Sequence, residues 1–244
     1  MNLKKAKVKR LHDDLYLKEN RYKKPKDSAK FLISLIKKEL NKNKNKKKIL
    51  EYIDIGCAVG ELIYALNHRL PNLNLTGIDI IPKLLKKARL YNPNSTFYLK
   101  DINKKNFSLK RKYDFITLTG VISIFDDFKI CLDNIYKLMH NNSKLYLHGH
   151  FNPFPYDVFI KYKDKKFPNI YQSGWNILSL DTIKKYCSKK NLKIDVYPFK
   201  FKKNLHPNKK DLVRTWTLEH KNKKYFTNGL NLLLTKYFLV ISKK

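Results

Sequence analysis

Apolar residues recur along this chain with two different periods, and the two periods alternate. Over residues 26–40 they recur at helical spacing, on one face of a helix that Asp27 or Ser28 would cap. From residue 49 onward, short apolar runs alternate with segments of helical period. The pattern predicts helices at 60–69, 82–91, 127–139 and 180–190, and strands at 49–55, 73–79, 96–100, 113–119, 144–150, 192–199 and 230–241.

Strands that alternate with helices form βαβ units, and such units build a mostly parallel sheet. The predicted fold class is therefore α/β, a doubly wound sheet of seven strands preceded by a helical segment over residues 1–48. Segments 151–178 and 200–228 break the rhythm, and long irregular segments in such folds are typical of lids or substrate loops. We find no internal repeat and no domain boundary, so we expect residues 1–244 to form one domain.

The formal net charge of +33 points to nucleic acid or an anionic membrane surface as a partner. However, only six of the 53 basic residues are Arg, and Asn, Ile, Tyr and Phe are abundant. A- and T-rich codons produce this composition without selection for a polyanion. Nucleic-acid sites also favour the Arg fork for bidentate contacts. We therefore favour compositional drift and keep RNA binding as the alternative.

The cysteines and the apolar runs bear on the cellular compartment. Cys57, Cys131 and Cys187 are far apart and form no C-x-x-C pair, which argues against a disulfide framework or a zinc site and fits a reducing cytoplasm. The first residues are basic without the apolar core of a secretory signal. The longest apolar run, 232–241, contains Lys236 and is too short for a transmembrane segment. We expect a cytoplasmic protein in which this run is a buried strand.

The stretch Y-I-D-I-G-C-A-V-G, residues 52–60, joins the first predicted strand of the sheet to the next helix. Open α/β sheets bind ligands at such turns. The dinucleotide fingerprint G-x-G-x-x-G fails because Gly56 and Gly60 are four residues apart, and the P-loop fails because Glu61 follows Gly60 where lysine is needed. The negative charges of Asp54 and Glu61 instead suit a ligand with a positive centre.

This stretch resembles the first motif, D-x-G-x-G-x-G, of the class I S-adenosylmethionine-dependent methyltransferases. Asp54, Gly56 and Gly60 match the motif, and Ala58 stands where the middle glycine often lies. The resemblance covers residues 49–150. It implies that Gly56, Cys57, Ala58 and Gly60 lie along the methionyl part of the cofactor, with Asp54 near its ammonium group.

Acidic residues also follow the next two predicted strands. Asp79 ends the second strand at the place where a carboxylate accepts hydrogen bonds from ribose hydroxyls. The resemblance implies that Asp79 and Ile80 contact the ribose and adenine, that Asp101 and Ile102 contact the adenine amino group, and that Thr119 belongs to the same site. Each carboxylate alone is also typical of a turn or a helix cap. Their succession at three consecutive strand ends favours the cofactor site.

The fifth predicted strand of the sheet ends in L-H-G-H, and its two histidines point to the same side. Methyl transfer to a hydroxyl benefits from a general base with a near-neutral pKa. His150 is therefore the first candidate base, with His148, Asp157 and His206 behind it. The alternative is a histidine that only hydrogen-bonds a loop. We expect no metal site, because no further ligands pair with the two histidines.

The late segments are rich in aromatic and amide side chains. The candidate acceptor-binding residues are Asn152, Tyr156, Tyr171, Trp175, Asn176 and Arg214. With their surrounding sequence, over residues 150–244, they resemble methyltransferases of bacterial capsule and surface-glycan biosynthesis. This resemblance implies a small glycan-related or phosphate-containing acceptor, bound by the substrate-facing half, 151–244, opposite the cofactor-binding half, 49–150.

The sequence thus predicts an S-adenosylmethionine-dependent O-methyltransferase of capsule biosynthesis that acts on a small molecule and releases S-adenosylhomocysteine. The motif D/N-P-P-F/Y/W, typical of enzymes that methylate nucleobase amino groups, is absent after the fourth strand. An RNA methyltransferase and a non-catalytic cofactor-binding protein remain as alternatives.

Overall fold

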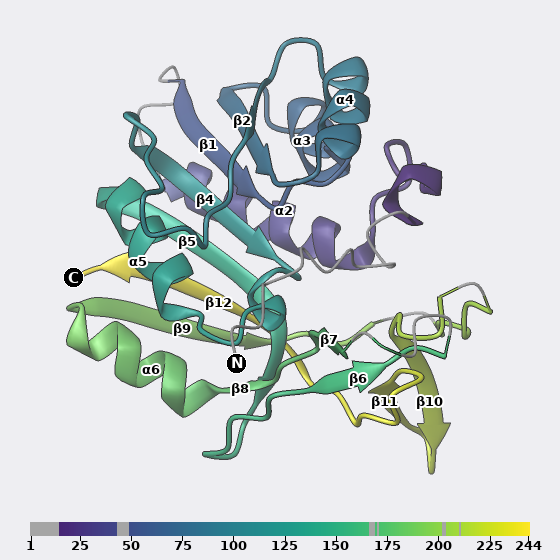
Figure 1. Cartoon of the computed structure of the whole chain (residues 1–244). Coiled ribbons are helices and arrows are strands. Elements are labelled where there is room, and N and C mark those ends of the chain that lie inside the picture. Colours follow the sequence, from purple (N-terminus) through teal and green to yellow (C-terminus); the bar gives the residue numbers. More distant parts are fainter. Residues whose placement is uncertain (1–14, 43–48, 166–168, 170, 202–203, 210) are drawn as a thin grey trace.

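The computed structural model describes residues 15–42, 49–165, 169, 171–201, 204–209 and 211–244. One large sheet runs through the chain in the strand order β3-β2-β1-β4-β5-β12-β9 (Figure 1). Its strands β1 to β5 and β9 are parallel to one another, and β12 is antiparallel to both of its neighbours. Their bounds are β1 Leu50–Ile55, β2 Leu73–Asp79, β3 Thr96–Leu99, β4 Tyr113–Thr119, β5 Met139–Asn152, β9 Leu192–Pro198 and β12 Lys236–Lys243.

Helices cover both faces of this sheet (Figure 1). The helices α2 (Asp27–Lys42), α3 (Glu61–Asn67) and α4 (Pro82–Tyr91) share one core cluster, and α5 (Lys129–Leu138) and α6 (Leu180–Lys189) share the other. Successive strand residues point to opposite faces. Tyr52 of β1 therefore belongs to the first cluster, whereas Ile53 and Ile55 belong to the second. This burial on both faces explains the nearly continuous apolar runs of the parallel strands.

The predicted α/β fold with a mostly parallel sheet is confirmed; seven strands follow one another across the sheet, and the short strand β8 (Leu178–Ser179) joins it as an eighth by pairing with β5. The bounds of β2, β4 and α4 agree with those predicted, and β5 extends beyond the predicted 144–150 at both ends. The expected helical segment 1–48 contains α2 and the short 3-10 helix η1 (Tyr16–Lys18), while residues 1–14 and 43–48 lie outside the described part of the chain.

The two late segments are not irregular throughout, contrary to the prediction, because each contains short strands. Between β5 and α6 lie the antiparallel pair β6 (Lys161–Lys163) and β7 (Tyr171–Ser173), and the short strand β8 (Leu178–Ser179), which pairs with β5. The second segment contains the hairpin of β10 (Trp216–His220) and β11 (Lys223–Thr227). Lys221 and Asn222 join these two strands at φ 47° and 58°, the backbone of a two-residue hairpin turn that usually carries glycine.

The start of the last strand was also predicted too early, at residue 230. Asn231 has a left-handed backbone at φ 55°, and β12 begins only at Lys236. None of the helices in the described ranges is long and apolar enough to cross a membrane. The pairing that matters for function is that of β12 with β5, in which Lys236 lies opposite His150.

Candidate active site

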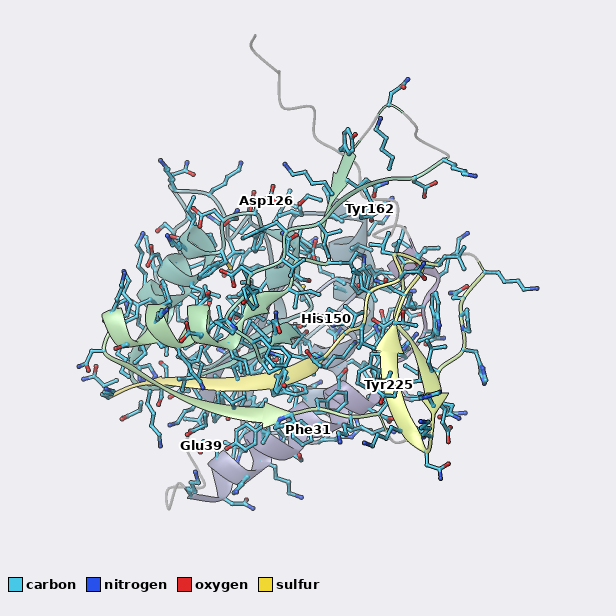
Figure 2. The ribbon with its side chains drawn as sticks, turned by 90° about the horizontal axis from the view of Figure 1, so that it is seen from below. Phe31, Glu39, Asp126, His150, Tyr162 and Tyr225 are labelled. Carbon is cyan, nitrogen blue, oxygen red and sulfur yellow. The ribbon has the colours of Figure 1, made fainter. Side chains whose placement is uncertain are left out.

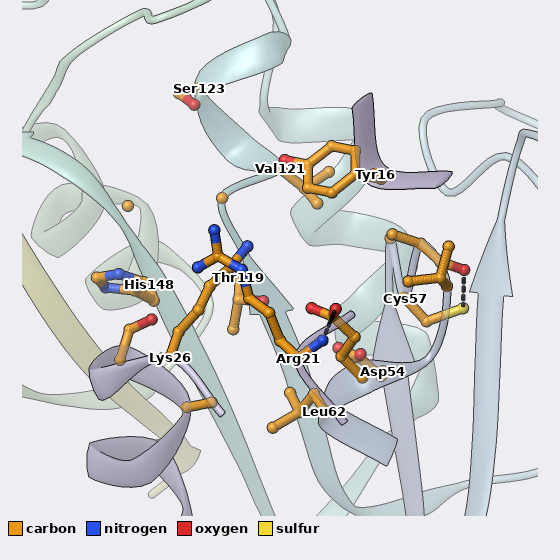
Figure 3. A pocket seen from close by; sticks show the side chains of 18 of the residues that line it. Tyr16, Arg21, Lys26, Asp54, Cys57, Leu62, Thr119, Val121, Ser123 and His148 are labelled. Carbon is orange, nitrogen blue, oxygen red and sulfur yellow. Dashed lines mark hydrogen bonds between the residues drawn. The ribbon is translucent and has the colours of Figure 1, made fainter. Parts of the chain in front are cut away.

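One large pocket, of about 880 Å³, lies at the carboxyl ends of the parallel strands (Figure 3). Its walls come from the segments that follow β1, β2, β3 and β4 and from the end of β5. The start of β12 reaches the same edge because this strand is antiparallel to β5. In open α/β sheets this edge, beside the first strand-to-helix turn, is the usual ligand site.

Nine of the ten expected cofactor residues line this pocket, namely Asp54, Gly56, Cys57, Ala58, Asp79, Ile80, Asp101, Ile102 and Thr119. The tenth, Gly60, lies behind the pocket wall as the N-cap of α3. A Cβ atom at Gly60 would approach Nδ2 of Asn92 to 2.8 Å and Cβ of Ala88 to 3.2 Å. This glycine therefore allows α3 to start close against α4 and does not face the ligand space.

The first turn has a left-handed backbone at two positions that face the pocket. Gly56 has φ 73°, and a Cβ atom there would lie 2.4 Å from Cγ2 of Val121. Ala58 has φ 48°, in the region that favours glycine. An alanine in this conformation costs about 1 kcal/mol. The replacement of the middle glycine by Ala58 therefore carries a backbone cost.

Asp54 is a buried acid without a salt bridge to any described residue. Its carboxylate, with the residue 2% exposed, accepts a hydrogen bond from the hydroxyl of Thr117 at 2.7 Å. Burial raises the pKa of Asp54 to about 7, the bond from Thr117 opposes this rise, and the charge of Asp79 adds to it. A cationic ligand group would stabilise the ionised carboxylate. The site therefore fits a sulfonium compound with an ammonium group.

Asp79 and Asp101 lie at the adjoining strand ends. The two oxygens of Asp79 accept hydrogen bonds from the backbone N–H groups of Ala58 at 2.9 Å and Ile81 at 3.0 Å. Oδ1 of Asp101 accepts from the N–H of Asn103 at 2.9 Å. Both acids thus serve as turn caps, the alternative that the sequence left open. A carboxylate oxygen has a second lone pair, so the cap does not exclude a contact with a ligand hydroxyl or amino group.

His148 and His150 line the opposite side of the pocket and are both buried. In Figure 3, His148 and Lys26 lie on one side of the pocket and Asp54 and Cys57 on the other. The Nδ1 atom of His148 hydrogen-bonds the carbonyl of Tyr237 at 2.9 Å. Burial lowers the pKa of His148 to about 3, and the charge of Lys236 adds to the effect. This histidine is therefore neutral.

His150 lies in the interior of the molecule (Figure 2), and its ring is 5.4 Å from that of Trp175. Burial holds the pKa of His150 well below its usual value, and the nearby charge of Lys236 lowers it further. The ring hydrogen-bonds the backbone of Thr235, while its buried Nδ1 atom has no hydrogen-bond partner. A neutral imidazole with one unused lone pair can accept a proton.

The other two candidate bases are placed differently. Asp157 is exposed and does not line the pocket. Its carboxylate accepts from the N–H of Ser179 at 2.6 Å and the hydroxyl of Thr182 at 2.8 Å, so it stabilises the start of α6. His206 does line the pocket but is exposed. No group of three or more His, Cys, Asp or Glu in the described ranges could hold a metal ion.

Of the six expected acceptor residues, only Trp175 and Arg214 line the pocket. Asn176 is fully buried and bonds the N–H of Ile160 at 2.8 Å, which identifies it as a structural residue. The three others lie outside the pocket lining, with Tyr156 69% and Tyr171 62% exposed, and with Asn152 bonded to the loop at Tyr156 and Phe154. Their distance from the pocket follows from the chain turning outward after β5 into the β6–β7 pair.

The N-terminal segment supplies pocket residues that the sequence did not indicate. Residues 16, 20, 21 and 24–29 line the pocket. The N–H of Arg21 donates to Glu61 at 2.7 Å, and the hydroxyl of Tyr22 donates to the carbonyl of Val59 at 2.9 Å. These bonds hold the segment against the first turn of the sheet. Tyr22 has an aromatic ring among charged neighbours, and this was the sequence feature that could have indicated that the segment packs against the domain.

Lys236 is the other pocket residue that the sequence did not assign. In the sequence, its charge only argues against a transmembrane segment over residues 232–241. A lysine inside an otherwise apolar strand is costly to bury unless another group compensates its charge. Its presence in the apolar run could therefore have indicated a ligand-binding position.

The chain matches the family model of a methyltransferase domain over residues 46–212, more than half of its length. Among sequence relatives, it is 28% identical over 114 residues to malonyl-[acyl-carrier protein] O-methyltransferase of Bacillus cytotoxicus, covering 46% of this chain and 38% of that one. It is 37% identical over 68 residues to trans-aconitate 2-methyltransferase of Escherichia fergusonii, covering 28% and 26%. The match thus spans well under half of these relatives.

Solved structures agree with the fold. An S-adenosylmethionine-dependent methyltransferase from Clostridium acetobutylicum superposes with a TM-score of 0.58 at 14% identity, covering 96% of both chains. The plantazolicin methyltransferase BpumL superposes with the same TM-score at 16% identity, covering 95% of this chain and 91% of that one. The family match, the sheet order and the acidic strand ends lead to one conclusion: this chain belongs to the methyltransferase domain family and has the fold of the class I S-adenosylmethionine-dependent methyltransferases.

Proposed function

We propose that this chain methylates an oxygen atom of a small acceptor, a glycan-related or phosphate-containing precursor of capsule biosynthesis. The observation that carries the proposal is the division of one pocket into two halves of different chemistry. Acidic residues at the ends of β1, β2 and β3 form one half, and His148, His150 and Trp175 form the other. One half suits a cationic cofactor, and the other suits proton transfer beside an aromatic ring.

Asp54, Asp79 and Asp101 would hold S-adenosylmethionine, with Gly56 and Ala58 allowing close approach of the backbone. The bound cofactor supplies an electrophilic methyl group on a sulfonium, so the protein has mainly to position the acceptor. Asp54 is a buried acid without a cationic partner among the described residues, and Gly56 leaves no room for a side chain beside Val121. Both features agree with a site for a cationic cofactor.

His150 would accept the proton of an acceptor hydroxyl on its free Nδ1 atom. The acceptor oxygen would lose this proton to His150 and gain the methyl group, and S-adenosylhomocysteine would be the second product. Trp175 lies against His150 and would exclude water from this step. The names of the malonyl-[acyl-carrier protein] relatives, which are O-methyltransferases, support an oxygen acceptor.

In the described part of the chain, the placement of the exposed lysines does not favour an RNA acceptor. Exposed lysines lie on α2 (Lys30, Lys37 and Lys38) and on α6 (Lys184 and Lys185), and these two helices cover opposite faces of the sheet. Figure 2 shows nitrogen-tipped side chains around the whole outline of the molecule. RNA binding would favour basic residues gathered on one face.

The three cysteines are free and buried, which supports a reaction in a reducing cytoplasm.

The test is methyl transfer from S-adenosylmethionine labelled in its methyl group. Separate pools of sugar nucleotides, glycosyl phosphates, RNA and protein are incubated with the full chain, and labelled product is counted in each. We expect label in a sugar or glycosyl phosphate pool, in a bond that resists mild alkali, as a methyl ether does and a methyl ester does not. Label only in RNA would establish the alternative enzyme, and tight cofactor binding without label in any pool would indicate a non-catalytic protein.

A further inference from the structure

Lys236 is the first residue of β12 and faces the pocket opposite His150 in the antiparallel pairing. Its ammonium group lies 5.2 Å from the ring centre of Phe201 and 6.0 Å from that of Phe226. No carboxylate forms a salt bridge with it in the described part of the chain. The aromatic faces compensate only part of the lost hydration of a buried ammonium group.

The surroundings of Lys236 carry further positive charge. Burial lowers the pKa of Lys236 to about 8, and the nearby charge of Lys26 adds to this effect. The carboxylate of Glu19 pairs with three other cations of the N-terminal segment and the late hairpin region, including Lys26. It lies 3.3 Å from Nζ of Lys26 and 3.2 Å from Nε of Arg21, and it also pairs with Arg214.

The two histidines beside Lys236 are neutral, so they contribute no charge to this half of the pocket. This half of the pocket therefore has an excess of cationic groups, whereas the cofactor half has an excess of carboxylates. A pocket wall of this kind attracts an anion, because the anion satisfies the ammonium group in a site of low polarity.

Building on the proposed methyl transfer, we infer that Lys236 binds an oxyanion of the acceptor, a carboxylate or a phosphate, and thereby holds the acceptor beside His150. Lys236 is thus a specificity-determining residue that selects anionic over neutral acceptors. The inference stands on the position of Lys236 in the pocket, its pairing opposite His150 and its aromatic neighbours, with no salt bridge to it among the described residues.

Anion binding would also improve His150 as a base. The charge of Lys236 is one of the causes that hold its pKa low, and a bound oxyanion would cancel that charge. The hydroxyl proton would then pass to Nδ1 of a stronger base, while the acceptor oxygen takes the methyl group. A neutral sugar would leave His150 in its unfavourable state, so the same contact would select the acceptor and promote its reaction.

The test measures anion binding directly, without a known acceptor. The full chain is saturated with S-adenosylhomocysteine, and fluorescence of Trp175 is followed while inorganic phosphate, or in a second series acetate, is added. The variant Trp175→Phe identifies the signal of this tryptophan against that of Trp216. We expect saturable binding, weakened about tenfold or more in Lys236→Met and within about threefold of wild type in Lys236→Arg. Lys184→Met, an exposed site on α6, is the matched control and should bind like wild type.

The two series distinguish the chemical source of the oxyanion. Tighter binding of phosphate would indicate a phosphate group on the acceptor, and tighter binding of acetate would indicate a carboxylate. Absence of saturable binding in the wild type, or equal binding in Lys236→Met, would overturn the inference and leave the proposed methyl transfer standing. If S-adenosylhomocysteine itself fails to bind by calorimetry, the proposed function fails instead. Lys236→Gln is a second neutral variant in case the methionine variant does not fold.

Discussion

Cofactor binding should depend on pH through Asp54. Burial raises the pKa of this carboxyl to about 7, and only its ionised form can pair with the ammonium group of the cofactor. Below that pKa the free protein carries a proton on Asp54, which must leave before the ammonium group binds. Affinity should therefore rise as the pH rises toward about 7 and level off above it.

The size of the effect follows from the ionised fraction. With a pKa of about 7, Asp54 is about nine-tenths ionised at pH 8 and about one-tenth ionised at pH 6. The dissociation constant of S-adenosylhomocysteine should consequently be about tenfold larger at pH 6 than at pH 8. This corresponds to a loss of about 1.4 kcal/mol of binding free energy.

The matched variant is Asp54→Asn. Its amide can still accept the hydrogen bond from Thr117 but cannot ionise, and a neutral amide is less costly to bury than a carboxylate. At pH 8 the variant should bind about tenfold or more weakly, because a charge-assisted contact is lost. At pH 6 the difference should shrink, because most of the wild-type protein is then protonated at Asp54.

Isothermal titration calorimetry with S-adenosylhomocysteine at several pH values measures both dissociation constants. The amino group of the free ligand titrates identically in both experiments. The ratio of the dissociation constants of Asp54→Asn and wild type therefore reports on Asp54. A ratio that does not change between about pH 6 and pH 8 would refute the reasoning, since it would mean that Asp54 is either fully ionised throughout or not in contact with the ligand.

Four further predictions follow from the site. Asp79→Ala should weaken S-adenosylhomocysteine binding by about 1–3 kcal/mol in calorimetry, because it also frees the N–H of Ala58. His150→Ala should lower turnover about a hundredfold or more in the labelled-methyl assay and leave cofactor affinity unchanged; full turnover would exclude it as the base. Ala58→Gly should raise the free energy of unfolding in urea by up to about 1 kcal/mol, since φ is 48° there. Asp157→Ala should destabilise the protein by about 1 kcal/mol and leave turnover intact, because Asp157 bonds the N-cap residue Ser179 and Thr182 at the start of α6.

The local pattern was sufficient for most of the sheet. The bounds of β2 and β4 follow from apolar runs between turn signals, and those of α4 from its period and from Pro82 in its first turn. The late hairpin was missed because its turn uses Lys221 and Asn222 where glycine is the usual signal. Strands β10 and β11 are also largely exposed, so they lack the apolar alternation of a half-buried strand.

Nine of the ten expected cofactor residues line one pocket for a topological reason. Parallel strands end at one edge of the sheet, so residues that follow β1, β2 and β3 meet there wherever they lie in the chain. Gly60 was assigned to the cofactor half from its place in the motif, and the structure shows that its neighbour is Asn92. The acceptor residues had no such rule, and Tyr156 and Tyr171 lie on the surface because the chain leaves the sheet after β5.

By itself, the sequence determined the order of the strands and helices, the acidic strand ends and the turn that adjoins them, because each of these depends on neighbouring residues or on a general property of parallel sheets. The tertiary structure decided the acceptor half. Lys236 is far from His150 in the chain and is brought opposite it only because β12 returns antiparallel to β5. The neutral state of His150 depends on its burial and on the charge of Lys236, and the lowered pKa of Lys236 depends on burial and on the charge of Lys26. No local sequence pattern carries that information.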